Sequence, residues 1–127
     1  MTDPRFKHAI ILFAHGSRDN LWRRPIEAVA EQVKQLSPET EVACAYLELT
    51  EPDLPTTVDR LVQAGVNVMR IVPMFLGVGR HAREDLPLLL QDLQTRYSEV
   101  RFELRNAIGE EPELTRAMAA IALRSKA

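Results

Sequence analysis

The sequence has little cysteine and little net charge. Its one cysteine, Cys44, cannot form a disulfide within the chain. Cys44 lies in an apolar run with no basic neighbour in sequence, which indicates a small core residue rather than a nucleophile. The formal net charge is only −2, and no long block of like charges occurs. We therefore expect neither a nucleic acid nor a membrane as a partner.

Long apolar runs are also missing. The longest one falls far short of the roughly 20 residues that a membrane-spanning helix needs. The apolar stretch 9–14 is followed at once by a histidine and charged residues, unlike a signal peptide. These features predict a cytoplasmic protein. At 127 residues, the chain is long enough to bury a core, and we expect one domain over residues 1–127.

Apolar runs alternate along the chain with segments of helical spacing. The runs predict strands over residues 8–14, 41–47, 66–72 and 100–105, and the last of these alternates strictly, as a half-exposed edge strand does. Apolar spacings of three and four predict helices over 21–36, 54–64, 85–97 and 111–124. Gly65 is expected to end the second helix. Asp85 is expected to cap the third helix, with Pro87 in its first turn.

This alternation predicts an α/β fold. We expect a single three-layer domain in which helices cover both faces of a four-stranded parallel sheet. The strand order assumed here is 2-1-3-4, the flavodoxin-like order, in which the first and third strands are neighbours. Connections leave these two strands in opposite directions, so a ligand crevice is expected between the loops that follow them.

Two of the three histidines belong to those loops. His15 comes directly after the first strand, and His81 is placed in the long loop 73–84 after the third. A lone loop histidine is most often solvated, but two imidazoles converging on one crevice could share a metal ion or a proton. His8 lies at the start of the first strand, away from this crevice, and is expected to have a structural role.

The residues around the two histidines leave several interpretations open. The apolar segment 73–79 is either buried under the next helix or forms one wall of a pocket for a large flat ligand, where glycines allow close approach. Arg18, Arg80 and Arg83 could hold the carboxylates of an acidic ligand, or be solvated. The segment His-Gly-Ser-Arg-Asp at 15–19 would also suit an anion near a helix N-terminus, so a histidine-dependent phosphoryl-transfer enzyme is a further possibility.

Three segments carry a family resemblance: HGSRD at 15–19, YLELTEP at 46–52 and VPMFLGVGRHARED at 72–85. Their order and spacing resemble the small CbiX-type sirohydrochlorin chelatases, over nearly the whole chain. The resemblance implies ATP-independent insertion of a divalent metal, cobalt or ferrous iron (nickel in some relatives), into sirohydrochlorin in cobalamin or sirohaem biosynthesis. It implies no organic cofactor, because the metal is a substrate. It also implies a homodimer with the macrocycle cleft near the interface.

The resemblance also implies roles for particular residues. His15 is expected to accept a proton and to bind the metal, with His81 as the second metal ligand. Substrate contacts are expected from Glu51 and from the run Leu76, Gly77, Val78, Gly79, Arg80 and His81. Glu48 is an alternative to Glu51, and either carboxylate could instead cap a helix. A non-catalytic metal or tetrapyrrole carrier of the same fold is the alternative function.

Overall fold

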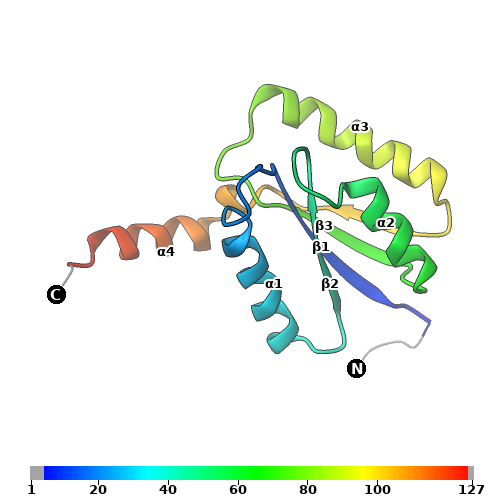
Figure 1. Cartoon of the computed structure of the whole chain (residues 1–127), viewed down its shortest axis with the longest axis horizontal. Helices are drawn as coiled ribbons and strands as arrows, with labels where there is room; N and C mark the ends of the chain where they lie inside the picture. Colours follow the sequence, from blue (N-terminus) through cyan, green and yellow to red (C-terminus); the bar gives the residue numbers. More distant parts are fainter. Residues whose placement is uncertain (1–4, 126–127) are drawn as a thin grey trace.

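The computed structural model describes residues 5–125, which form an alternating series of strands and helices (Figure 1). The elements follow one another as β1 (His8–Ala14), α1 (Arg24–Leu36), β2 (Glu41–Tyr46), α2 (Leu54–Gln63), β3 (Val68–Pro73), α3 (Arg80–Arg96), β4 (Arg101–Leu104), the short 3-10 helix η1 (Ile108–Glu110) and α4 (Pro112–Leu123). Every predicted strand and helix is present, and the predicted α/β class is confirmed.

The four strands form one parallel sheet in the order β2-β1-β3-β4. This is the predicted order. β1 lies between β2 and β3, so that Leu12 is level with Cys44 on one side and with Val72 on the other. The chain crosses from β2 past β1 to reach β3, which places the switch point at the carboxyl ends of β1 and β3.

The main core lies between the sheet and helices α2 and α3. Alternate residues of β1 and β3, including Ile11, Phe13 and Ile71, are at most 1% exposed and pack with Val58 of α2 and Leu93 of α3. The intervening residues Leu12 and Ala14 point to the other face, because successive strand side chains alternate. That face is covered by α1, which packs on β1 and β2.

Cys44 lies in β2 and is half-buried, with its thiol unpaired by any disulfide. Burial raises the pKa of this thiol, and the nearby Glu27 carboxylate raises it further. We expect iodoacetamide to alkylate Cys44 more slowly at pH 8 than it alkylates the urea-unfolded chain, because less thiolate is present. Equal rates for the folded and unfolded protein, measured by mass spectrometry, would contradict this expectation.

Helix α2 begins at Leu54 because Asp53 caps it. The Asp53 carboxylate accepts a hydrogen bond from the backbone N–H of Thr56 at 2.9 Å. The capping carboxylate of α2 is therefore Asp53 and not Glu48 or Glu51. At the other end, Gly65 has φ 92°, a left-handed conformation that favours glycine, which confirms it as the residue that ends α2.

Replacing Asp53 with alanine should lower the free energy of unfolding by about 1 kcal/mol at pH 7. Hydrogen bonds from Thr56, through its side chain and its backbone, lower the pKa of Asp53 below its usual range. The carboxylate therefore stabilises the fold above its unfolded pKa of about 3.9, and this contribution is lost as the pH falls through the lower folded value. Urea unfolding of both proteins from pH 7 to pH 2.5 should show their difference shrinking with acid.

The matched variant is Asp53→Asn, because asparagine caps a helix about as well as aspartate but does not titrate. It should keep most of the stability at pH 7. A loss in Asp53→Ala that is the same at every pH would show that the carboxylate charge does not contribute.

Helix α3 begins five residues before the predicted start, so the placement of residues 80–84 in a loop was wrong. Gly79, with φ −66° and ψ 163°, is the N-cap, and Arg83 donates the first helical hydrogen bond to its carbonyl. Asp85 is therefore not the cap, and Pro87 lies inside the helix rather than in its first turn. Pro87 is exposed, so the helix can bend away locally and lose one hydrogen bond without disturbing the core.

Helix α4 differs most from its expected place. It packs on η1, has no buried residue, and extends away from the sheet (Figure 1). η1 itself is held firmly: Gly109 donates its N–H to the Phe75 carbonyl at 2.9 Å. A Cβ on Gly109 would lie 1.8 Å from the Leu76 carbonyl oxygen, so only glycine fits there.

None of the helices between residues 5 and 125 has the length and apolarity to cross a membrane.

Candidate metal and tetrapyrrole site

His15 lies on the loop that follows β1, beside the loop that follows β2. Leu47 donates its N–H to the Ala14 carbonyl at 2.8 Å, and Glu48 donates to the His15 carbonyl at 2.9 Å. Gly16 comes next and has φ 107°. A Cβ at this position would lie 1.7 Å from the Glu48 carbonyl oxygen. The absence of a side chain at Gly16 therefore allows the two loops to lie in backbone contact.

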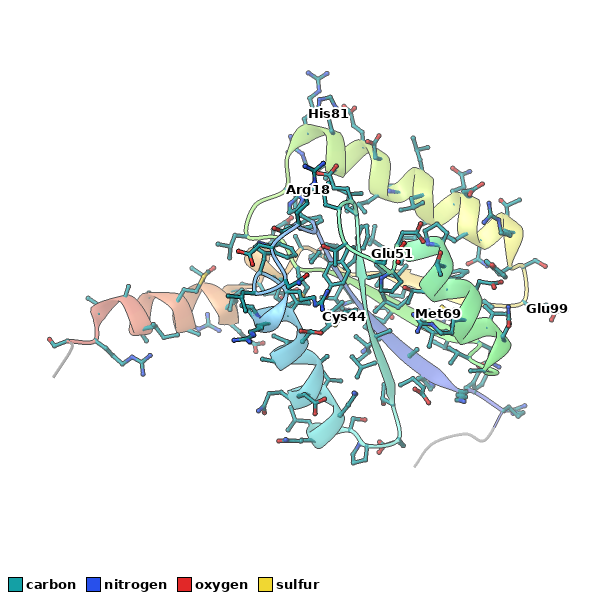
Figure 2. All side chains as sticks on the ribbon, viewed as in Figure 1. Arg18, Cys44, Glu51, Met69, His81 and Glu99 are labelled. Carbon is teal, nitrogen blue, oxygen red and sulfur yellow. The ribbon has the colours of Figure 1, made fainter. Side chains whose placement is uncertain are left out.

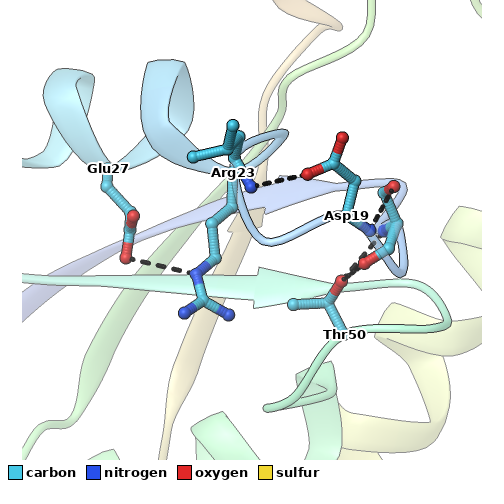
Figure 3. Close-up of polar contacts among 6 residues, drawn as sticks. Asp19, Arg23, Glu27 and Thr50 are labelled. Atoms are coloured by element: carbon cyan, nitrogen blue, oxygen red, sulfur yellow. Dashed lines mark hydrogen bonds and ion pairs between the residues drawn. The ribbon is translucent and has the colours of Figure 1, made fainter.

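A second link between these loops is made by Thr50 and Ser17. The Thr50 hydroxyl donates to the Ser17 carbonyl at 2.7 Å and accepts from the Ser17 N–H at 2.9 Å. Figure 3 shows these bonds beside Asp19, which accepts from the Leu21 N–H, and the Arg23–Glu27 ion pair at the start of α1. The His15 loop is thus fixed at both ends before the chain enters α1.

Leu49, on the loop after β2, has φ 65°, which is uncommon for a residue with a side chain. The loop holds it there: Thr50 donates its N–H to the Glu48 carbonyl at 2.8 Å, across Leu49. Leu47 is 50% exposed and Leu49 is 56% exposed, although both are large and apolar. Strained backbone and exposed apolar side chains together are typical of ligand-binding loops.

The imidazole of His15 lies on the ring of Phe75. The two ring centroids are 4.2 Å apart and the planes are inclined by 30°. Phe75 is only 3% exposed, and Phe13 supports it from the core with centroids 6.2 Å apart. The main chain fixes the same segment, because Met74 donates its N–H to the Phe13 carbonyl at 2.7 Å. Phe75 therefore forms an apolar floor that limits the orientations of His15.

His81 lies in the first turn of α3 and faces the same cavity as His15. Figure 2 places His81 at the N-terminal end of α3 and Arg18 at the same end of the molecule. The cavity has a volume of about 440 Å³ and opens to solvent. It is lined by Phe13, His15, Leu47, Phe75, Gly79, Arg80, His81, Ala82, Asp85, Leu86 and Leu89. The imidazoles of His15 and His81 and the carboxylate of Asp85 thus border a largely apolar cavity at the switch point. We call it the histidine cavity.

The predicted substrate-binding residues divide into two groups. Gly79, Arg80 and His81 line the histidine cavity, whereas Leu76, Gly77 and Val78 do not. Leu76 is 68% exposed, and Val78 packs against the core. Of the two interpretations of residues 73–79, burial applies to Phe75, while Leu76 faces solvent.

Neither Glu48 nor Glu51 lines the histidine cavity. Both border a hollow formed by the loop after β2 itself, and Glu51 also borders a groove along the free edge of β2. That groove, about 590 Å³, is larger than the histidine cavity but has no histidine and lies away from the switch point. Chemistry favours the histidine cavity, because proton transfer and metal binding at neutral pH need groups such as imidazole.

Sequence reasoning missed Leu47 and the cavity-facing residues of α3. Leu47 could have been found because β2 also neighbours β1, so its following loop borders the same crevice. Ala82, Asp85, Leu86 and Leu89 follow the helical spacing of one face. Ala82 was expected in a loop and Asp85 at the helix cap, whereas Leu86 and Leu89 were expected to face inward from this helix. Asp85 follows His81 by four residues, and this spacing puts both on one side of the helix.

The arginines near the cavity differ in their surroundings. Arg80 forms an exposed ion pair with Glu84 at 3.2 Å, which contributes little to stability. Arg18 and Arg83 are exposed.

Within residues 5–125, no three His, Cys, Asp or Glu side chains gather closely enough to hold a metal ion together.

The fold and the histidine cavity define a doubly wound α/β protein with paired imidazoles at its switch point. Comparison with known proteins specifies this class further. The family model described as CbiX matches residues 9–124. The chain belongs to the CbiX family.

Individual relatives agree with this assignment. A sirohydrochlorin cobaltochelatase of Methanopyrus kandleri is 34% identical over 82 residues, covering 65% of this chain and 57% of the relative. A sirohydrochlorin ferrochelatase of Bacillus subtilis is 30% identical over 112 residues, covering 88% of this chain and 43% of the relative. The chain thus spans little more than half of the first relative and less than half of the second.

Two solved structures share the fold. A protein of Marinobacter aquaeolei VT8, described as a cobalamin (vitamin B12) biosynthesis CbiX protein, superposes with a TM-score of 0.79 at 38% identity, covering 91% of this chain and 93% of that one. The sirohydrochlorin chelatase SirB of Bacillus subtilis subspecies spizizenii, solved in complex with cobalt, gives a TM-score of 0.76 at 28% identity, covering 91% and 49%.

Proposed function

We propose that this protein inserts a divalent metal ion, cobalt or ferrous iron, into sirohydrochlorin without ATP. The observation that carries the proposal is the pair His15 and His81, which line one apolar cavity from the loop after β1 and from the first turn of α3. The names of the relatives support the reaction, since they are cobaltochelatases and a ferrochelatase acting on sirohydrochlorin.

The proposed chemistry assigns separate tasks to the two histidines. Metal insertion must remove two protons from pyrrole nitrogens while the ion is delivered. His15 and His81 bind the incoming ion. As the ion passes to the ring nitrogens, His15 accepts one of the two protons, and the other is released to water at the open mouth of the cavity. Neutral imidazole binds both cobalt and ferrous iron and accepts protons near neutral pH. Two protein ligands leave coordination positions for water and ring nitrogens, as transfer to the macrocycle requires.

Exposed apolar side chains around the cavity support a large flat substrate. Leu47, Leu49 and Leu76 are each at least half exposed, on the loops that follow β2 and β3. We propose that the macrocycle covers the histidine cavity and extends across its rim, where Leu76, Gly77, Val78 and Glu51 contact it. Gly79 and Arg80 contact it from inside the cavity. The carboxylates of the substrate would pair with Arg18, Arg80 and Arg83.

The proposal includes the setting of the enzyme. The chain acts as a single CbiX-type unit over residues 1–127 and as a homodimer, in the cytoplasm, in sirohaem or cobalamin biosynthesis. No organic cofactor takes part, and nickel is a possible third metal substrate. Nucleic acids and membranes are not partners.

The test follows sirohydrochlorin absorption after addition of Co²⁺ or Fe²⁺, with and without the protein, under anaerobic conditions. We expect the metallated spectrum to form faster with the protein than in buffer, in proportion to protein concentration. The heat-denatured protein is the control. Spectral change on binding with no acceleration of metal insertion would favour the carrier instead.

A further inference from the structure

Two polar side chains of α3 border the histidine cavity one helical turn apart. His81 lies in the first turn, at the end of the helix labelled in Figure 2, and Asp85 lies four residues later. Both line the cavity. Residues at this spacing have Cβ atoms about 5–6 Å apart. Helical side chains also lean toward the N-terminus of their helix, so rotation of the two side chains brings the Asp85 carboxylate to the His81 ring.

Neither side chain is engaged elsewhere. Within residues 5–125, no hydrogen bond or ion pair involves the His81 ring or the Asp85 carboxylate. The neighbouring acid Glu84 is paired, because its carboxylate lies 3.2 Å from the Arg80 guanidinium. The Asp85 carboxylate is therefore available to accept a hydrogen bond from an imidazole N–H.

The two histidines of the cavity differ in how they are held. The His15 ring lies on Phe75 with centroids 4.2 Å apart, and Phe75 is buried. The His81 ring is exposed and lies on no aromatic ring of the described part of the chain. A histidine that binds a metal almost always donates its other ring N–H to an oxygen acceptor, which fixes the ring. Among the described residues that line the cavity, Asp85 is the one with a carboxylate.

We infer that Asp85 is a positioning residue: its carboxylate accepts a hydrogen bond from one ring N–H of His81 while the other ring nitrogen binds the metal ion. A neutral imidazole carries one N–H, so this bond selects the tautomer whose metal-binding nitrogen is unprotonated. It also fixes the orientation of the ring and makes the ring a stronger ligand. The inference rests on the proposed function, in which His81 is a metal ligand.

Asp85 acts on the ion through His81 and not as a third ligand. No three His, Cys, Asp or Glu side chains within residues 5–125 lie close enough to hold one ion together, so His15, His81 and Asp85 do not converge on one point. Leu86 and Leu89 line the cavity beside Asp85. When the macrocycle covers this apolar wall and excludes water, the hydrogen bond between Asp85 and His81 becomes stronger.

Titration of the full chain with Co²⁺ alone, followed by calorimetry and visible absorption, tests the inference without sirohydrochlorin. Asp85→Ala should weaken Co²⁺ binding by about 10- to 100-fold. Asp85→Asn should lose less, because its amide oxygen still accepts a hydrogen bond. The absorption spectrum at saturating Co²⁺ should keep its wild-type shape in Asp85→Ala, because the ligands are unchanged. Asp85 is exposed, so both variants should keep the fold, checked by circular dichroism.

The matched control is Asp92→Ala. Asp92 lies two turns further along α3, is exposed, and pairs with Arg96 at 3.6 Å. Among the described residues, it is not one of those that line the histidine cavity. This variant removes the same charge from the same helix and should bind Co²⁺ as the wild type does.

A double-mutant cycle with His81→Ala separates positioning from direct contact with the ion. Once His81 is removed, Asp85→Ala should cause no further loss of Co²⁺ affinity, because Asp85 has no imidazole left to orient. The inference would be overturned by an equal further loss in that background, by wild-type affinity in Asp85→Ala, or by a wild type that does not bind Co²⁺. Failure of metal insertion by a protein that shows the expected coupling would instead contradict the proposed chelatase activity.

Discussion

Replacing His15 with alanine is expected to lower the rate of metal insertion into sirohydrochlorin by about 100-fold or more. A positioned acid–base group contributes roughly 10²–10⁴-fold, and His15 is proposed to bind the metal as well. The imidazole is exposed at the mouth of the cavity, so its removal leaves Phe75 and the core in place. Initial rates with Co²⁺ would be measured by absorption, and the melting temperature should stay within a few degrees of wild type.

The matched control for this prediction is His8→Ala. His8 is an exposed histidine at the start of β1, at the opposite end of the strand from His15. It should keep the wild-type rate. His81→Ala should also lose most activity, because it removes the second proposed ligand. Wild-type rates in both cavity variants would show that the site is misassigned.

The second large effect is expected from Gly16→Ala, which should lower the free energy of unfolding by about 3 kcal/mol. Two costs combine at this position. The backbone φ of 107° is strained for any residue with a side chain, and the new methyl group would lie 1.7 Å from the Glu48 carbonyl oxygen. The loops after β1 and β2 would have to separate, so His15 should move and insertion activity should fall too. Urea unfolding and the insertion assay measure the two losses.

Gly77→Ala provides the comparison for stability. A Cβ on Gly77 meets no atom within 4 Å, and its backbone is not in the left-handed region. We expect its unfolding free energy to stay within about 0.5 kcal/mol of wild type. If Gly16→Ala were equally mild, the close contact between the two loops would not be needed for folding.

The sheet could be predicted because its strands are local and strongly patterned. The run from Ala9 to Ala14 is apolar throughout, as a strand buried on both faces must be. The charged residues Arg101, Glu103 and Arg105 alternate with apolar ones, and in the structure Glu103 pairs with Arg70 and Arg105 on the uncovered face of β4. The strand order 2-1-3-4 was assumed because it is the commonest topology for alternating strands and helices, and the structure has this order.

The start of α3 could not be predicted from local rules. Pro87 and Asp85 suggested a helix beginning near residue 85, because proline inside a helix is costly and aspartate is a good cap. The structure tolerates Pro87 because it faces solvent, and Gly79 caps the helix through its extended backbone. As a result, His81 lies in a helical turn with Asp85 on the same side, instead of in a flexible loop.

Local sequence was enough to predict the alternation of strands and helices, the position of His15 directly after a buried strand, and the family. These depend on residues close together in the chain. The folded structure was needed to show that His15 and His81 face one cavity with Phe75 beneath, that Glu48 and Glu51 lie outside it, and that α4 has no buried residue. Those outcomes depend on packing between segments distant in sequence, where backbone contacts such as Gly16 to Glu48 and Gly109 to Leu76 set the directions of the loops.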